Sequence, residues 1–267
     1  MTGLISSLLE WADSRAGLPP VGYRIRTVHW VLDMTSRGMA VAAYGQTDAV
    51  PAMRRSGPRP MPLLAVDSAA YVLGVRGPGT RAEQAAARGE AFWRQMEKWA
   101  SADRHPAVVA ALALAHTYDR AASPHEVPAG DRVAVRVEGI WLHRLPEAVG
   151  HWRELLTKAK GGPLGICIGC RQAQPLATSL PNAIPAHLVP GARHEAQLTV
   201  LPLTEREGGH LPVCVPCGDR ASMALQTMLE DRGRVVRDRD RTTVVFGVGA
   251  GGADDAALAV LHTLGVQ

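Results

Sequence analysis

The stretch YRIRTVHWVLDMTSRGMAVAAY, residues 23–44, decides the fold class of this chain. Its two halves, Tyr23–Leu32 and Met39–Tyr44, have the apolar and β-branched character of strands. Between them, Thr35-Ser-Arg-Gly38 is typical of a turn. We therefore predict a β-hairpin, in which one strand face is apolar and the other is mixed.

Helical patterns surround this hairpin instead of alternating with single strands. Apolar residues recur at helical spacing in several segments, and shorter alternating segments predict strands. Arg132–Glu138 alternates valines with charged or small residues, which predicts a half-buried strand, and an extended segment is expected to enter Tyr71–Gly74. The expected helices are residues 3–15, 81–101, 106–118, 146–160 and 219–230, and a further strand is expected at 241–246. This order favours an α+β fold of mixed helices and β-hairpins over a regular α/β fold.

Length and composition bound the class of protein. The chain has 267 residues, of which 46% are hydrophobic and 20% charged, and these values are typical of a globular protein. The net charge is only +4, so composition alone does not indicate a nucleic-acid binder. The longest apolar run, Ala107–Ala115, is about half of the roughly 20 residues that span a bilayer. The first ten residues lack the basic region of a signal peptide, so we expect a cytoplasmic protein with no membrane contact.

Four cysteines form two C-x-x-C pairs, Cys167–Cys170 and Cys214–Cys217, with 43 residues between them. Four thiolates are the ligand set of a tetrahedral structural Zn²⁺ site, and structural disulfides are uncommon in a reducing cytosol. A redox function of one pair is the alternative, against which the presence of two pairs argues. The sequence therefore predicts a four-cysteine zinc-knuckle module in the second half of the chain.

Histidines in the loop between the knuckles are further potential metal ligands. His187, His194 and His210 all lie there, and any of them could replace a thiolate. With four cysteines available, we expect the three histidines to face solvent.

Three regions follow from these patterns. Residues 1–160 form an N-terminal α+β region, residues 161–220 the zinc-knuckle module, and residues 221–267 a helix–strand–helix segment that closes the same domain.

An arginine-rich loop is the main candidate for nucleic-acid contact. Arg54, Arg55, Ser56, Gly57 and Arg59 lie in a stretch with no acidic residue between Asp48 and Asp67. Flanking prolines and glycines favour an exposed loop that presents guanidinium groups to phosphates or guanine edges. A solvated loop without a ligand is the alternative. A second cluster, residues 231–241, interleaves five arginines with three aspartates and indicates a salt-bridged surface.

No pattern indicates an enzyme. Gly247-Val-Gly-Ala-Gly-Gly252 matches G-x-G-x-x-G, but only 15 residues follow it, too few for the rest of a dinucleotide-binding unit. The chain has no G-x-S-x-G, H-E-x-x-H or G-x-x-x-x-G-K-[ST] pattern. We therefore expect a protein without catalytic activity; a zinc-dependent nuclease would need acidic or histidine ligands in a cleft, and none is apparent.

Several spaced blocks resemble the N-terminal part of the large subunit of the type I-C CRISPR surveillance complex, Cascade. The blocks occur in order over nearly the whole chain, and together they are fairly specific. They are Leu18–Tyr23, Val28–Asp33, Arg54–Gly57, Pro62–Leu64, Ala70–Gly74, Arg88–Phe92, Cys167 with Ile184–His187, and Arg241–Phe246. Family members continue well past the last of these blocks, whereas this chain has about 20 further residues, so we expect a minimal large subunit or a fragment.

The resemblance implies a non-catalytic subunit of a crRNA-guided complex. Its partners would be the crRNA 5′ handle, target double-stranded DNA at the protospacer-adjacent motif, other CRISPR complex subunits and, where one is recruited, a helicase–nuclease. Two alternatives remain. The four cysteines are similar to those of the zinc-containing large subunit of type IV complexes, and a truncated subunit could act as a protein–protein adaptor that docks without reading DNA.

Overall fold

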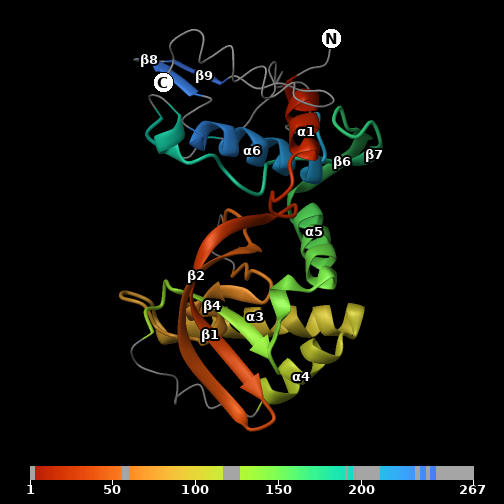
Figure 1. The fold of residues 1–267 in the computed structure, drawn as a ribbon. Helices are drawn as coiled ribbons and strands as arrows, with labels where there is room; N and C mark the ends of the chain where they lie inside the picture. Colours follow the sequence, from red (N-terminus) through yellow and green to blue (C-terminus); the bar gives the residue numbers. More distant parts are fainter. Residues whose placement is uncertain are drawn as a thin grey trace. The chain divides into compact units, whose positions relative to one another are not determined.

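The computed structural model describes residues 4–55, 60–116, 127–189, 192–194, 196, 211–231, 235–238 and 241–244. The chain divides into two compact units. The first unit combines Met1–Gly22 with Leu155–Gln267, and the second unit is Tyr23–Glu154. The boundary near residue 154 falls inside helix α5, Pro146–Lys160 (Figure 1).

A mixed β-sheet organises the second unit. Strands β1 (Tyr23–Thr35) and β2 (Gly38–Pro51) form an antiparallel hairpin whose register ends at Thr35 and Gly38. This confirms the predicted hairpin and its turn, although both strands are longer than predicted. The remaining strands are β3 (Val66–Ser68), β4 (Arg132–Val137) and β5 (Ile140–Trp141). The order is β2-β1-β4-β3, with β5 paired to β4; β1 and β4 are parallel, and the other pairs are antiparallel.

Strand β4 lies inside this sheet, and its burial differs from the prediction. Val133, Ala134 and Val135 are all completely buried, so both faces of the strand are covered at its centre. The half-buried strand predicted from alternation was therefore wrong. A strand that is covered on both faces carries small or valine side chains on both of them. The alternating pattern alone did not distinguish such a strand from a half-buried one.

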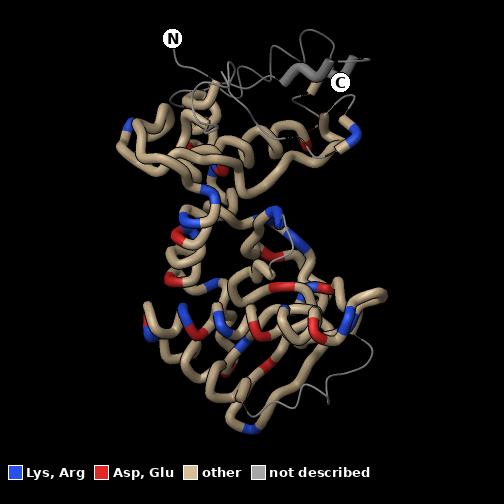
Figure 2. Tube along the Cα trace, turned by 180° about the vertical axis from the view of Figure 1, so that it is seen from behind, with Lys and Arg blue, Asp and Glu red and all other residues tan. Residues whose placement is uncertain are grey.

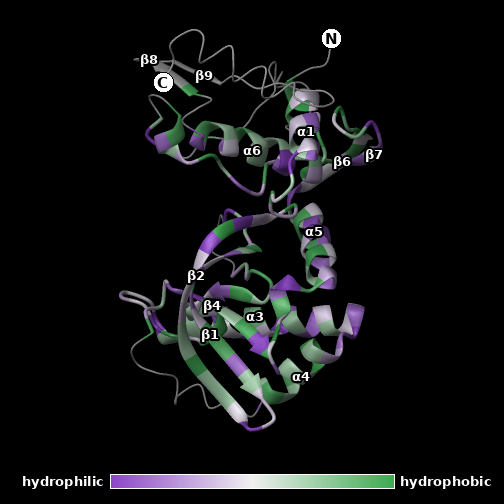
Figure 3. Ribbon diagram, viewed as in Figure 1, coloured by the Kyte–Doolittle hydropathy of each residue, from purple (hydrophilic) through white to green (hydrophobic). Residues whose placement is uncertain are grey.

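Helices pack against the sheet and supply several of the largest buried side chains. In α3 (Ala82–Asp103), Phe92, Met96 and Trp99 are fully buried, as their spacing predicted. Helix α4 (Pro106–Ala115) begins at Pro106, packs on β1 and β4, and is strongly apolar in Figure 3. A 3-10 turn, η2 (Leu142–Arg144), leads to α5.

The segment around Tyr71 is helical, not extended. Helix α2 spans Ala69–Val72 and follows β3 directly, and its four residues are all buried. The expected extended segment is therefore confined to Val66–Ser68. Burial against α3, where the Trp93 indole N–H donates to the carbonyl of Val72 over 3.2 Å, outweighs the strand preference of Tyr71 and Val72.

The first unit is built on two helices that are far apart in sequence. Helix α1 (Leu4–Ser14) packs on α6 (Val215–Glu230), and Ile5, Leu8 and Trp11 are buried. This packing places residues 4–22 with the C-terminal half of the chain, whereas the sequence grouped them with residues up to 160. The boundary placed at residue 220 falls inside α6.

Two hairpins and a 3-10 turn complete the described part of the first unit. Strands β6 (Gly161–Ile166) and β7 (Ala173–Ala177) are antiparallel, as are β8 (Val235–Asp238) and β9 (Arg241–Val244), and η3 spans Ala186–Leu188. The β9 strand confirms the strand predicted at 241–246 as far as Val244, and residues 245 and 246 lie outside the described residues. The glycine run at 247–252 and the segment after it lie outside the described residues.

The helices and sheets together make an α+β fold, as predicted. None of the helices in the described ranges combines the length and apolar character that crossing a bilayer requires.

Candidate metal centre and arginine loop

The first C-x-x-C pair forms the turn that joins β6 to β7. The backbone N–H of Cys167 donates to the carbonyl of Gln172 over 3.0 Å, and the N–H of Arg171 donates to the carbonyl of Cys167 over 2.9 Å. Arg171 has a φ of 61°, which reverses the chain directly after Cys170. This tight turn directs both cysteines to the same side.

The second pair lies at the start of α6. Cys214 is the residue before the helix and forms an isolated antiparallel bridge with Leu176 of β7. Cys217 is in the first helical turn, in which the N–H of Gly218 donates to the carbonyl of Cys214 over 2.9 Å. Pro216 is tolerated here because the first N–H groups of a helix have no intrahelical acceptor.

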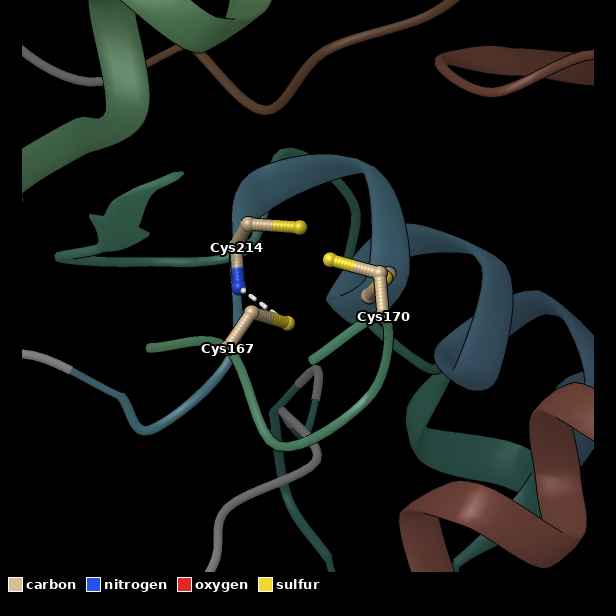
Figure 4. Close-up of side chains that lie close together, drawn as sticks. Cys167, Cys170 and Cys214 are labelled. Atoms are coloured by element: carbon tan, nitrogen blue, oxygen red, sulfur yellow. Dashed lines mark hydrogen bonds between the residues drawn. The ribbon is translucent and has the colours of Figure 1, made fainter. Parts of the chain in front are cut away.

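The two pairs meet through backbone hydrogen bonds. The N–H of Ile168 donates to the carbonyl of Pro212 over 3.0 Å, and the N–H of Cys214 donates to Sγ of Cys167 over 3.2 Å. Figure 4 shows the latter contact as a dashed line, with the sulfurs of Cys167, Cys170 and Cys214 directed toward one another. The structure thus brings all four predicted ligands together: the four Sγ atoms lie within 4.8 Å of one another.

Two glycines allow this close approach. A Cβ at Gly169 would lie 3.0 Å from Cβ and 3.1 Å from Sγ of Cys217, and 2.8 Å from Cδ1 of Leu9. A Cβ at Gly218 would lie 2.4 Å from Cδ2 of Leu180. Both glycines therefore serve close packing.

Burial and charge limit ionisation of the cluster. Cys167 and Cys214 are buried, Cys217 is half-buried and Cys170 is exposed, and none forms a disulfide. The side-chain hydrogen bond from Cys217 holds the pKa of Cys214 at about 5 in spite of burial. The same contact and burial raise the pKa of Cys217, and burial raises that of Cys170. Thiolates repel one another, so full ionisation of the cluster requires a cation among them.

This donor set fits a metal ion that prefers sulfur. Tetrahedral Zn²⁺ with bonds of about 2.3 Å places its sulfur ligands roughly 3.8 Å apart. The four Sγ atoms, all within 4.8 Å of one another, could adopt this arrangement with small movements. The start of α6 adds a positive dipole end that favours thiolates at Cys214 and Cys217. The four cysteines are therefore compatible with metal binding.

The histidines of the intervening loop do not join this cluster. His187 and His194 are exposed, as expected, and His210 lies outside the described residues. Among the residues that the structure describes, the metal-ligating group consists of the four cysteines alone.

The arginine loop is described only in part. Arg54 and Arg55 are exposed, whereas Ser56, Gly57 and Arg59 lie outside the described residues. The guanidinium group of Arg55 forms an ion pair with the carboxylate of Asp67 and lies 4.3 Å above the ring centre of Tyr71. Arg55 thus has an intramolecular role that the sequence analysis missed.

Asp67 explains why Arg55 is held. Its side chain is almost fully buried, and its carboxylate also accepts hydrogen bonds from the N–H groups of Leu63 and Ser68, over 2.7 and 2.6 Å. Burial raises the pKa of Asp67, and Arg55 opposes this change. The signal available in sequence was that Asp67 is the first acidic residue after the arginine loop.

A comparison with known families identifies the class of protein. The family model described as CRISPR-associated protein (Cas_Csd1) matches residues 7–265, nearly the whole chain. The chain therefore belongs to this family of CRISPR-associated proteins, which is the family of the type I-C large subunit. The resemblance seen in sequence is confirmed at this level. Among curated proteins, none matches the chain.

Proposed function

We propose that this chain is a non-catalytic large subunit of a crRNA-guided, Cascade-type effector complex in the cytoplasm. The observation that carries the proposal is the family match over residues 7–265. In RNA-guided systems, base pairing with the guide reads the target, and protein reads only a short adjacent motif in duplex DNA. The partners in this proposal are the crRNA 5′ handle, the motif-bearing duplex, and the other subunits of the complex.

We further propose that Zn²⁺ is bound by Cys167, Cys170, Cys214 and Cys217. The four thiols supply the charge and number of ligands that a structural zinc site needs, and the site joins the β6–β7 turn to the start of α6. When bound, the ion would neutralise the thiolates and link these elements. It has no catalytic role in this proposal, because all four positions of a tetrahedral ion are then occupied by protein.

For nucleic-acid contact, Arg54 is the clearest of the predicted residues, with Arg59 as a sequence-based expectation. Arg54 is exposed, whereas the charge of Arg55 is largely offset by Asp67. Ser56 and Gly57 would shape the loop between these arginines. We propose that Arg55 supports the base of the loop, and that Arg54 and Arg59 contact phosphate.

A protein–protein adaptor is the second candidate. The ion pair of Arg55 favours it, because this pair removes one of the three arginines from the surface expected to bind nucleic acid. The match to the Csd1 family supports the type I-C function over the type IV alternative.

The test is reconstitution of the complex from this chain, crRNA and the co-encoded CRISPR subunits. Binding of the assembled complex to motif-bearing and motif-free duplexes would be measured at two salt concentrations. The chains compared are wild type, the double variant Arg54→Ala/Arg59→Ala and the control variant Arg37→Ala. Arg37 is an exposed arginine in the β1–β2 turn. Loss of a phosphate contact weakens binding about equally on all sequences and lowers the salt slope, whereas loss of base reading costs roughly 1–3 kcal/mol on the preferred motif alone.

Unchanged affinity, salt slope and motif preference in a normally assembled double variant would support the adaptor and contradict DNA contact by this loop. Failure of the chain to assemble with crRNA and the other subunits would contradict the proposed function as a whole.

A further inference from the structure

Two arginines outside the predicted loop lie side by side in the sheet of the second unit. Arg26 is in β1 and Arg132 is the first residue of β4, the parallel neighbour of β1. The guanidinium group of Arg132 donates to the carbonyl of Thr27 over 3.4 Å, and its backbone N–H donates to Nδ1 of His29 over 3.0 Å. These contacts place the side chain of Arg132 next to the Arg26–Thr27 segment of β1.

Neither arginine has an acidic partner within the described part of the chain. Arg26 is exposed, and its guanidinium group donates to the carbonyl of Ile25 over 3.5 Å. The residue opposite Arg26 in the hairpin register is Asp48. The carboxylate of Asp48 is already bound by Arg144 at 2.7 Å and by Nε2 of His143 at 2.8 Å.

The acidic group that acts electrostatically on Arg132 is also occupied. Asp67 influences Arg132 electrostatically, but its carboxylate is bound by Arg55 and by backbone N–H groups. Charges of both signs are interleaved along the chain of this unit in Figure 2.

The two positive charges oppose each other. Burial lowers the pKa of Arg132, and the neighbouring charge of Arg26 lowers it further; Asp67 raises it and Arg55 lowers it. Like charges held together in a half-buried setting are unfavourable unless an anion lies between them. Guanidinium groups present planar sets of N–H donors that match the oxygens of phosphate.

We infer that Arg26 and Arg132 bind a phosphate group, and that in the complex this group belongs to the backbone of the nucleic acid. The second half of this inference rests on the proposed function. The site is separate in sequence from the Arg54 loop and adds a contact from the sheet itself. Because it contacts phosphate and not base edges, it would position the nucleic acid without reading its sequence.

The test uses the full chain with two probes. Thermal unfolding is measured in inorganic phosphate and in chloride at equal ionic strength, and binding to a labelled single-stranded RNA and a random DNA duplex is measured over a range of salt. The variants are Arg26→Gln, which leaves the core untouched, and Arg132→Lys, which keeps the charge but removes the planar donors. Arg37→Gln is the matched control, an exposed arginine in the same hairpin.

We expect phosphate to raise the Tm of wild type and Arg37→Gln equally, and this shift to be lost in Arg26→Gln and reduced in Arg132→Lys. The slope of log K against log salt should fall by about 0.7 for single strands or about 0.9 for duplex in Arg26→Gln only. Equal changes in Arg26→Gln and Arg37→Gln would show a general charge effect and overturn the inference.

Two further outcomes separate the sources of phosphate. Loss of the phosphate shift with unchanged nucleic-acid binding would overturn the nucleic-acid assignment and leave a site for free phosphate. If the full chain bound neither RNA nor DNA, the nucleic-acid assignment of this site would be overturned, while assembly with crRNA and the other subunits would separately decide the proposed function. The phosphate arm would still decide whether Arg26 and Arg132 form an anion site.

Discussion

The backbone N–H of Cys214 donates a hydrogen bond to Sγ of Cys167, over 3.2 Å, and so joins the two C-x-x-C pairs directly. The residues are 47 positions apart in sequence. A backbone N–H directed at a potential metal ligand orients that side chain. The contact therefore links the β6–β7 turn to the start of α6 at the ligands themselves, and loss of Cys167 or Cys214 should loosen that link.

The first prediction concerns the exposed ligand. Cys170→Ser should lower bound zinc from about one ion per chain and lower the Tm markedly, because binding free energy at structural zinc sites, roughly 10–16 kcal/mol in peptides, is also folding free energy. Cys170 is exposed, so the substitution removes little core packing. Elemental analysis and thermal unfolding measure the two effects.

The control for this prediction is wild type treated with a strong chelator, which should unfold at about the temperature of the variant. Purified wild-type protein with far less than one zinc ion per chain would contradict the metal assignment. A fall in Tm that chelation of wild type does not reproduce would assign the cysteines a packing function.

The second prediction concerns Gly169. Gly169→Ala should destabilise the first unit and weaken metal binding, because the added Cβ would lie 3.0 Å from Cβ and 3.1 Å from Sγ of Cys217. Gly150→Ala is the matched control: Gly150 lies within α5, and an added Cβ meets nothing within 4 Å. Alanine is favoured over glycine in a helix by roughly 0.5–1 kcal/mol, so this control should be slightly stabilising. Equal Tm values for the two variants would contradict the close approach at Gly169.

Local patterns predicted much of the fold. The β1–β2 hairpin, the buried residues of α3 and the proline at the start of α4 follow from turn chemistry, helical spacing and the missing N–H of proline. The cysteine cluster was also predictable, because ligand spacing is a local property and the choice of four thiols is chemically narrow.

Long-range packing was not predictable in the same way. The pairing of α1 with α6 and the interior position of β4 depend on which surfaces meet, and neither leaves a periodic signal in one segment. The same holds for Arg55, since its loop composition indicated a solvent-exposed donor. Its partner Asp67 lies in β3, which pairs with β4.

The third prediction follows from that pair. Arg55→Gln should destabilise the protein by about 1–3 kcal/mol, because it leaves the buried carboxylate of Asp67 without its cation. Arg55→Gln/Asp67→Asn should recover part of this loss, since no unpaired charge remains. Denaturant unfolding of the two single variants and the double variant gives the coupling energy. Arg54→Gln, at the neighbouring exposed position, is the control and should change stability by less than about 1 kcal/mol.

The pH dependence of Arg55→Gln provides a second readout. Burial raises the pKa of Asp67 already in wild type, and removal of Arg55 raises it further. A carboxyl group with a raised pKa in the folded state adds stability at low pH and loses it as the pH rises through that pKa. The variant should therefore approach wild type as the pH is lowered. A deficit that does not depend on pH would show that Arg55 acts through packing on Tyr71 and not through charge.

The last prediction concerns Asp48, whose pKa is lowered, whereas that of Asp67 is raised. Burial opposes its ionisation, but hydrogen bonds from His143 and Arg144 prevail and lower its pKa to about 2. The unfolded value is about 3.9. The ionised form therefore adds stability above about pH 4, which is lost as the pH falls toward 2. Asp48→Asn should be less stable than wild type at neutral pH, and this difference should shrink between pH 4 and pH 2.

The control is Glu83→Gln, which removes an exposed carboxyl group on α3. Its stability relative to wild type should change little over that range. An Asp48→Asn deficit that persists at pH 2 would show that the side chain stabilises the η2 turn by shape and not by its charge.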